Sequence, residues 1–335
     1  MKSRIWTEID FGKTGVQSDF ARVPYSSNTS AYGWIPVPMV CINGQSGPTA
    51  LFTAGTHGDE YEGQVALLKL ARELSSAKIA GRVIILPALN QPAVAAGRRN
   101  SPLDDGNLNR LFPGDAQGTP TEMIAHYVVT ELLSMADVII DLHSGGSSLD
   151  HLPLALAREG KAEEETKQIH RLLRSFAAPF SVITKGTGGG AASTLYAAAE
   201  QLGVPAITTE LGSGTTLSRQ GLEFAEAGLR RVLRDYGIAP DLDVVQAPVT
   251  RFARSLGPAS SIFAVHAGLF EPFVELGQAV TRGQVAGNLH RLDDPLANPS
   301  VLTFKADGIV CWRRFPTLTA AGDALYGMMS NSIEE

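Results

Sequence analysis

Two segments of this chain place histidine and carboxylate residues in a pattern that suits metal binding. His57 and Glu60 lie three residues apart in GTHGDEYEG, which follows the apolar run 49–53. A strand that ends there would present an imidazole and a carboxylate from one tight turn. His143 follows a second apolar run, in DLHSGG. Two histidines and one glutamate are a common ligand set of catalytic zinc, so we predict one Zn²⁺ per chain on these three residues.

Other residue types in these segments leave some alternatives open. Asp59 and Glu62 are neighbouring carboxylates that either replace Glu60 or supply favourable negative charge at the start of the following helix. Other divalent ions that prefer nitrogen and oxygen ligands would also suit the site.

The remaining histidines do not combine a glycine-rich strand end with a nearby carboxylate of this kind in the sequence. We expect structural or surface roles for them: His126, His151, His170, His266 and His290.

Two further carboxylates lie at or near predicted strand ends. Asp141 precedes His143 by two residues, so in a strand both side chains point to the same side, and Asp141 either orients the imidazole or is simply a satisfied polar residue. Glu210 ends the apolar run 205–209 with no adjacent lysine or arginine. A bare buried carboxylate is costly, so Glu210 must face a metal, water or a partner, which makes it a candidate general base.

A long polar segment, 88–119, contains candidate substrate-binding residues. Loops of this length inside a compact domain are usually functional. Asn109 and Arg110 together suit a carboxylate, because guanidinium binds it through two bonds and the amide adds a donor. Arg99 would stabilise an oxyanion, although Arg98 adjoins it. Taken alone, these residues would be read as solvated loop cations.

The elements that must position these side chains alternate between strand and helix up to residue 236. This alternation predicts an α/β fold, a mixed sheet flanked by helices on both faces. Sites in such sheets form where strand ends open onto a crevice, and His57, His143 and Glu210 all follow strands. The predicted strands cover 37–42, 49–55, 82–87, 138–143, 180–183 and 205–210. The predicted helices cover 60–75, 121–135, 162–176, 192–202 and 220–236.

Beyond residue 240 the pattern changes to short strands and turns. We therefore predict a catalytic domain over 1–240 and a smaller all-β, barrel-sandwich-like domain over 241–335. Its sequence is similar to half-repeats of a lipoyl or biotinyl barrel, but its only lysine, Lys305, lies at a predicted strand end rather than a hairpin tip. We expect a structural domain that covers the site or forms an assembly surface, in a homo-oligomer.

Composition excludes several classes of function. The chain has 335 residues, 44% hydrophobic and 19% charged, with a net charge of −6, as in a soluble enzyme. No basic patch favours nucleic acid, and no apolar run approaches the roughly 18 residues of a membrane span. Cys41 and Cys311 lie in apolar surroundings and are expected to be buried thiols. We expect a cytoplasmic protein without a signal peptide.

Together these motifs resemble the succinylglutamate desuccinylase/aspartoacylase family, whose catalytic core is similar to that of zinc carboxypeptidases. GTHGDEYEG, NLNRLFPG, DLHSGG and TTELGSG occur in the family's order and span most of the chain. The first motif and its flanking sequence look closest to the branch of N-acetyl-diaminobutyrate deacetylases. The resemblance implies that His57, Glu60 and His143 bind zinc and that Glu210 is the base. It also implies that Arg99 polarises the acyl carbonyl and that Asn109 and Arg110 hold a substrate carboxylate.

Three functions are compatible with these observations. The first is a zinc-dependent amidohydrolase that removes a small acyl group, such as acetyl or succinyl, from an N-acyl amino acid. The second is a zinc carboxypeptidase acting on small peptides, which a β domain near the cleft would disfavour. The third is a non-catalytic binding or assembly module that uses the C-terminal domain, although the intact set His57, Glu60, His143 and Glu210 argues against it.

Overall fold

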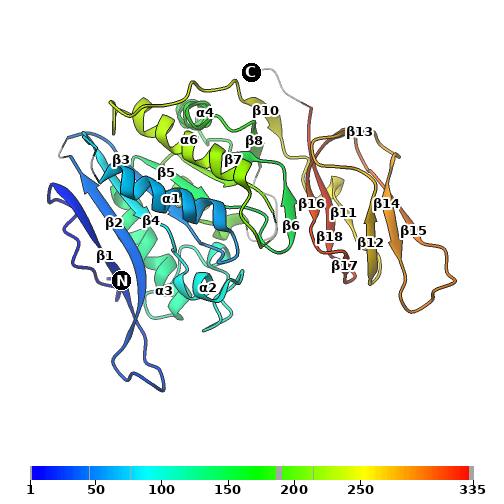
Figure 1. Ribbon diagram of the computed structural model, residues 1–335, viewed down its shortest axis with the longest axis horizontal. Helices are drawn as coiled ribbons and strands as arrows, with labels where there is room; N and C mark the ends of the chain where they lie inside the picture. The colour runs from blue at the N-terminus through cyan, green and yellow to red at the C-terminus, as the bar shows by residue number, and fades with distance from the viewer. Residues whose placement is uncertain (1, 45, 76, 186–190, 214, 332–335) are drawn as a thin grey trace.

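The computed structural model describes residues 2–44, 46–75, 77–185, 191–213 and 215–331. A large mixed sheet with helices on both faces forms one part of the molecule, and a smaller all-β part lies beside it (Figure 1). This architecture confirms the predicted fold class. The sequence GTGGG at residues 186–190 predicts a flexible connection between a strand and a helix, but these residues lie outside the described part of the chain.

The large sheet has nine strands in the order β1-β2-β4-β3-β5-β9-β7-β8-β10. Its centre is parallel, from β4 through β3 and β5 to β9, whereas β1, β2 and the β7/β9 pair are antiparallel. The strands are β1 (Gly15–Pro24), β2 (Trp34–Asn43), β3 (Thr49–Ala54), β4 (Arg82–Leu86), β5 (Val138–Leu142), β7 (Leu154–Arg158), β8 (Phe180–Thr184), β9 (Ala206–Glu210) and β10 (Arg251–Arg254).

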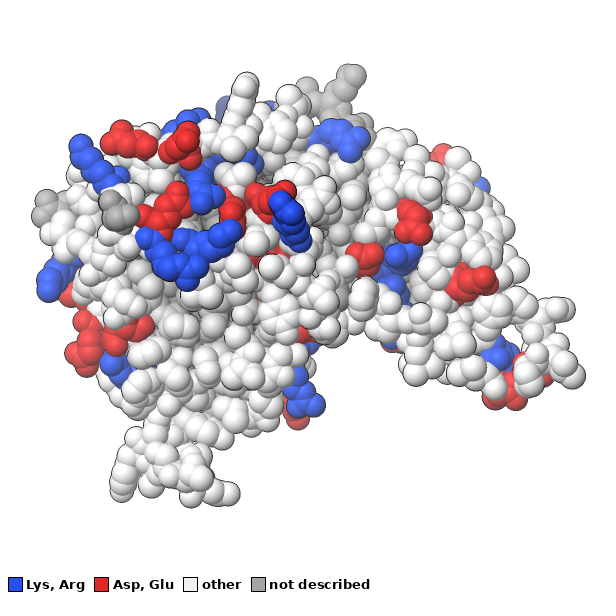
Figure 2. Space-filling model, in the orientation of Figure 1, with Lys and Arg blue, Asp and Glu red and all other residues white. Residues whose placement is uncertain are grey.

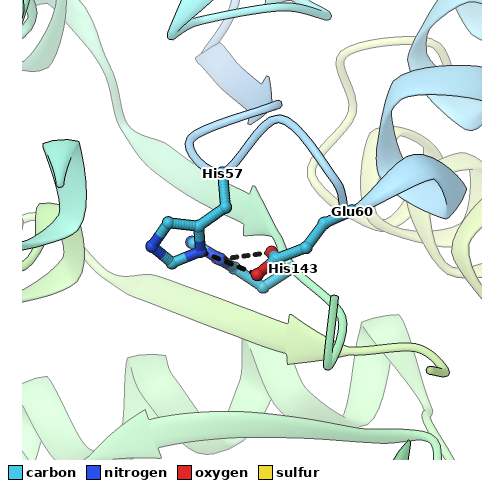
Figure 3. A group of neighbouring side chains, drawn as sticks. All are labelled: His57, Glu60 and His143. Atoms are coloured by element: carbon cyan, nitrogen blue, oxygen red, sulfur yellow. Dashed lines mark hydrogen bonds and ion pairs between the residues drawn. The ribbon is translucent and has the colours of Figure 1, made fainter. Parts of the chain in front are cut away.

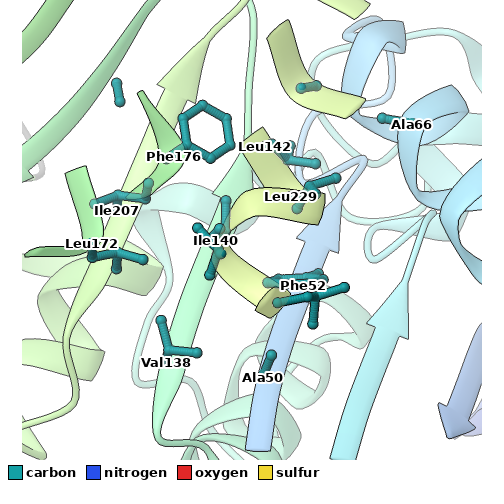
Figure 4. Close-up of a cluster of buried hydrophobic side chains, with 14 of the residues drawn as sticks. Ala50, Phe52, Ala66, Val138, Ile140, Leu142, Leu172, Phe176, Ile207 and Leu229 are labelled. Atoms are coloured by element: carbon teal, nitrogen blue, oxygen red, sulfur yellow. The ribbon is translucent and has the colours of Figure 1, made fainter. Parts of the chain in front are cut away.

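Helices cover both faces because consecutive residues of the central strands point to opposite sides. Phe52 and Ile140 face α1 (Tyr61–Leu74), α4 (Glu163–Phe176) and α6 (Arg219–Asp235), in the cluster drawn in Figure 4. Leu51 and Ile139 face the opposite side, with α3 (Pro120–Tyr127) and α5 (Leu195–Gln201). Such uninterrupted apolar strands are typical of a sheet that is buried on both faces.

The all-β part consists of two antiparallel sheets around their own apolar core. One sheet has the order β11-β18-β16-β13, and the other β15-β14-β12-β17. The strands are β11 (Ile262–Phe263), β12 (Gly268–Pro272), β13 (Ala279–Val280), β14 (Val285–His290), β15 (Ser300–Thr303), β16 (Gly308–Arg314), β17 (Leu318–Thr319) and β18 (Ala324–Met329). A strand from the first part, β6 (Leu149–His151), pairs with β16 and joins the two parts.

Several elements differ from the sequence prediction. Residues 1–48, which the sequence predicts as an extended segment with one strand over 37–42, contain a β-hairpin, β1 and β2, that extends the sheet. The long loop contains a short helix, α2 (Gln91–Ala96), and a 3₁₀ turn, Leu108–Arg110. The helix expected over 121–135 continues beyond α3 as a π turn, Val128–Leu132, and a 3₁₀ turn. Strand β10 pairs with β8, so the range 241–335 that we predicted as all-β includes the last strand of the large sheet.

Charged side chains of both signs alternate on the face over α1 and α6 (Figure 2). Ion pairs join these two helices, between Lys69 and Glu226 and between Arg230 and Glu73. This mixture contrasts with the single-sign surface of a nucleic-acid-binding protein. Within the described ranges, no helix is long and apolar enough to cross a membrane.

Candidate metal centre and active site

The candidate site lies where three neighbouring parallel strands end. In the register of β3, β5 and β9, Thr53 is opposite Asp141, which is opposite Thr208. The segments that leave these strands therefore start at the same edge of the sheet. They carry His57, His143 and Glu210 to one place, as the sequence predicted.

The turn that carries His57 and Glu60 is fixed by close packing against α2. A Cβ on Gly58 would lie 2.0 Å from the carbonyl oxygen of Ala93, so only glycine fits there. The backbone N–H of Gly58 donates to the carbonyl of Arg98 at 2.8 Å. The turn and the start of the long loop are thus held together, which places Arg99 beside His57.

His57, Glu60 and His143 point toward one another and are all buried (Figure 3). Nδ1 of His57 lies 2.7 Å from Oε1 of Glu60, and Nδ1 of His143 lies 2.9 Å from Oε2. Their candidate ligand atoms all lie within 4.8 Å of one another. Two imidazole nitrogens and one carboxylate leave a fourth position open, as catalytic zinc requires.

The outer contacts of both rings show why this donor set suits a cation. Nε2 of His57 lies 3.1 Å from Oδ1 of Asn107, and Nε2 of His143 lies 2.8 Å from Oδ2 of Asp141. Because these oxygens accept, each Nε2 carries a proton, and in a neutral ring the Nδ1 lone pair then faces the carboxylate of Glu60. Facing lone pairs repel unless a proton or a metal ion lies between them. The site therefore fits a divalent cation.

The electrostatics of the group favour the same arrangement. Burial alone would raise the pKa of the Glu60 carboxyl, but His57 and His143 beside it hold that pKa well below its ordinary value. Burial would lower the pKa of His143, but the carboxylates of Asp141 and Glu60 raise it well above normal. The negative charges thus outweigh burial at His143, and the space between the two histidines and Glu60 attracts positive charge.

The two other acidic residues of the first motif connect loops. Asp59 accepts from the backbone N–H of Ser147 at 2.9 Å. Glu62, which is 1% exposed, accepts from the hydroxyl of Ser144 and from the backbone N–H of Ser218, both at 2.6 Å. Neither belongs to the group that could hold a metal, so Glu60 is the motif's one carboxylate in that group among the described residues.

His57, Glu60 and His143, the candidate metal group, line a cavity of about 300 Å³. The other predicted site residues line it as well: Arg99, Asn109, Arg110 and Glu210. Nη1 of Arg99 lies 3.5 Å from Oε1 of Glu60, whereas the exposed Arg98 lines a different hollow. The structure thus places Arg99, rather than Arg98, beside the candidate metal position.

Two hydrogen bonds hold Asn109 and Arg110 at this cavity. Oδ1 of Asn109 accepts from the backbone N–H of Leu195 at 3.3 Å, and Arg110 donates to the carbonyl of Asn109 at 2.7 Å. Burial and the positive charge of Arg99 lower the pKa of the Arg110 guanidinium. Two neighbouring cations at one cavity favour an anionic ligand such as a carboxylate.

Glu210 is a second carboxylate that lines the same cavity as His57, Glu60 and His143. Burial, with the negative charge of Glu60, raises the pKa of its carboxyl to about 8. A carboxyl whose pKa lies near neutrality is suited to take up and release a proton. A nearby cation would favour the ionised form and lower this pKa again.

Asn107 and His151 lie at the site, although the sequence predicted no role there for either. Asn107 contacts His57, and its signal was present in NLNR, where one asparagine lies two residues before the other. His151 lines the cavity and is 8% exposed, with Nε2 3.7 Å from Oε2 of Glu210. No local signal marks His151, because its position depends on strand pairing with residues far along the chain.

Sequence comparison identifies the family of this site. The model of the succinylglutamate desuccinylase/aspartoacylase catalytic domain matches residues 46–236, which carry all the predicted site residues. The chain belongs to this family. It is therefore an enzyme of a hydrolase family, as predicted, which argues against the non-catalytic alternative.

Relatives within the family are similar over almost the whole chain. N-alpha-acetyl-L-2,4-diaminobutyric acid deacetylase of Halomonas elongata is 38% identical, covering 96% of this chain and 94% of that protein. The product-bound ectoine utilization protein EutE (DoeB) of Ruegeria pomeroyi is 37% identical with a TM-score of 0.94, covering 99% and 100%. A succinylglutamate desuccinylase/aspartoacylase of Rhodobacter sphaeroides is 34% identical with a TM-score of 0.91, covering 98% and 100%.

Proposed function

We propose that this protein is a zinc-dependent amidohydrolase that removes a small acyl group from an N-acyl amino acid. The observation that carries the proposal is one cavity in which His57, Glu60 and His143 face Glu210 and Arg99. The similarity to the Halomonas elongata deacetylase supports acetyl as the acyl group. It also makes N-α-acetyl-2,4-diaminobutyric acid the first substrate to test.

The roles of the side chains follow from their positions. His57, Glu60 and His143 would hold the metal ion. A bound zinc ion supplies a Lewis acid that lowers the pKa of water to about 7. Glu210 accepts the proton of the attacking water and passes it to the leaving amine, which a carboxyl with a raised pKa does readily.

The cationic residues bind the two ends of the substrate. Arg99 donates to the acyl oxygen as negative charge develops on it in the tetrahedral intermediate. Arg110, with the amide of Asn109, binds the α-carboxylate and so fixes the amide bond near Glu210.

The size of the cavity supports a small substrate over a peptide. About 300 Å³ lies at the lower end of the range for small-molecule sites. A carboxypeptidase needs an open groove for the residues that precede the scissile bond. The all-β part lies next to this edge of the sheet, because β6 at the cavity pairs with β16.

A substrate panel tests the acyl and amino-acid preference. The purified enzyme is assayed with N-acetyl and N-succinyl derivatives of several amino acids, including both mono-acetyl isomers of 2,4-diaminobutyric acid, beside blocked dipeptides. We expect the highest kcat/KM for an N-acetyl amino acid. Preference for dipeptides would support the carboxypeptidase alternative instead.

Metal removal tests the cofactor. Metal analysis of the purified protein should find about one zinc per chain. Dialysis against a chelator should abolish turnover, and added zinc should restore it. Unchanged turnover in protein shown to be metal-free would contradict the proposal.

Two further proposals concern the setting of the enzyme. Cys41 and Cys311 are both buried and free, which supports a reducing compartment such as the cytoplasm.

We also propose that the protein is a homo-oligomer, which light scattering on the purified protein would test. A monomer at micromolar concentration would contradict it.

A further inference from the structure

His151 belongs to a strand that two different parts of the chain hold in place. In Figure 1, β6 lies between the large sheet and β16. His151 is opposite Trp312 in the β6/β16 register, and the backbone N–H of Leu152 donates to the carbonyl of Cys311 at 2.9 Å. Asp150 adds an ion pair with Arg313 at 3.4 Å. The C-terminal sheet therefore fixes the backbone on which His151 sits.

The other side of the same segment is tied to the strand that carries Glu210. Asp150 forms a bridge with Ser213, and Leu154 is opposite Glu210 in the β7/β9 register. His151 lies between these two anchor points. Its side chain consequently reaches the cavity beside Glu210, which is the one carboxylate near it in ion-pair range among the described residues.

The side chains of His151 and Glu210 can form a hydrogen bond with each other. Oε2 of Glu210 and Nδ1 of His151 are both buried and lack a hydrogen-bond partner. Burial lowers the pKa of His151 to about 4, so the ring is neutral near pH 7 and carries one proton. A buried N–H without a partner is rarer than a buried acceptor without one, which favours the proton on Nε2, facing Glu210.

We propose that His151 is a positioning residue that donates its Nε2–H to Oε2 of Glu210 and thereby fixes which oxygen of the general base faces the reacting water. The 3.7 Å separation needs to shorten by about 0.5–1 Å to reach hydrogen-bond distance. Catalytic hydrogen bonds are often long in a ligand-free site and shorten when substrate binds. The C-terminal domain thus contributes to catalysis through β6. This inference rests on the proposed role of Glu210.

Kinetics of three variants test the proposal. His151→Leu removes the donor, and His151→Gln places an amide N–H near the position of Nε2. His290→Gln, on the exposed surface of the C-terminal domain, is the control. We expect His151→Leu to lower kcat about 10–100-fold with KM within about twofold, whereas His151→Gln recovers most of kcat. A kcat within threefold of wild type in His151→Leu, or a rise confined to KM, would overturn the proposal.

A second measurement does not depend on turnover. In metal-free protein with ¹³C-labelled glutamate, the Glu210 signal is identified by its loss in Glu210→Gln, and its pKa is followed by NMR. Because a donor stabilises the ionised carboxyl, we expect a pKa about one unit higher in His151→Leu than in wild type, with His151→Gln close to wild type. Equal pKa values of Glu210 in all three proteins would refute the hydrogen bond between His151 and Glu210. An inactive wild type with this shift would instead refute only the proposed function.

Discussion

The carboxylate of Asp141 lies 2.8 Å from Nε2 of His143, two residues further along the same strand end. Its other oxygen accepts from the hydroxyls of Thr53 and Thr56, at 2.7 and 3.1 Å. Two hydroxyls, one from β3 and one from the turn after it, therefore hold the carboxylate in place, and the carboxylate in turn holds the imidazole. This contact favours the orienting role over a merely satisfied polar residue.

Replacement of Asp141 should weaken metal binding. Asp141→Asn keeps the shape but loses the charge that orients His143, and we expect zinc affinity to fall about 10–100-fold. Competition with a chromophoric chelator measures this. Asp137→Asn, at the start of the same strand, is the control, because Asp137 accepts from the backbone of Thr49 away from the site. Equal affinities for both variants would contradict the prediction.

Replacement of Glu210, the proposed base, should separate catalysis from metal binding. Glu210→Gln keeps the volume but cannot accept the proton, so we expect kcat to fall about 10²–10⁴-fold with zinc content unchanged. Glu200→Gln is the matched control, since Glu200 pairs with Arg158 outside this cavity. Turnover by Glu210→Gln near the wild-type rate would exclude the assigned role.

The two adjacent arginines should differ sharply. Arg99→Met removes the donor beside the metal group, and we expect a loss of about 10²–10³-fold in kcat, as for other oxyanion donors. Arg98→Met should stay within about threefold of wild type, because Arg98 lies outside the cavity. The reverse order of the two kcat values would reassign the role to Arg98.

Glu62 should contribute mainly to stability. Its buried carboxylate accepts hydrogen bonds from both Ser144 and Ser218. Glu62→Gln keeps one oxygen for the Ser218 N–H, but it loses the negative charge that strengthens both bonds and forces the Ser144 hydroxyl to change from donor to acceptor. We expect a loss of about 1–3 kcal/mol in the free energy of unfolding, seen as a thermal midpoint lower by several degrees. Glu223→Gln, at an exposed helical ion pair with Arg219, should change the midpoint little.

The buried His151 should make the metal-free protein acid-sensitive. Its pKa falls from 6.5 to about 4 on burial, so between these values the unfolded chain binds a proton that the folded protein does not. Stability is therefore full above pH 6.5 and decreases as pH falls. At pH 5 we expect wild type to have lost about 2 kcal/mol relative to His151→Gln, compared with pH 7.5. If the difference in free energy of unfolding between wild type and His151→Gln were the same at both pH values, this effect of burial would be contradicted.

The sequence by itself determined the group of residues that could hold a metal ion and the sheet that carries it. His57 and Glu60 share one turn, and that turn and the strand end before His143 are specified locally, by an apolar run followed by glycine. Parallel strands then bring such ends to one edge without further information. For the same reason the α/β class and most central elements were predictable from short-range patterns.

Only the tertiary structure decided the contacts that depend on distant partners. Arg99 rather than Arg98 lines the cavity because Gly58 anchors the loop at Arg98. His151 reaches Glu210 because β6 pairs with β16, more than 150 residues later in the chain. No local pattern specifies such a pairing, since its register is set by how the two sheets pack. The sequence thus located the candidate metal ligands, and long-range strand pairing placed His151 beside Glu210.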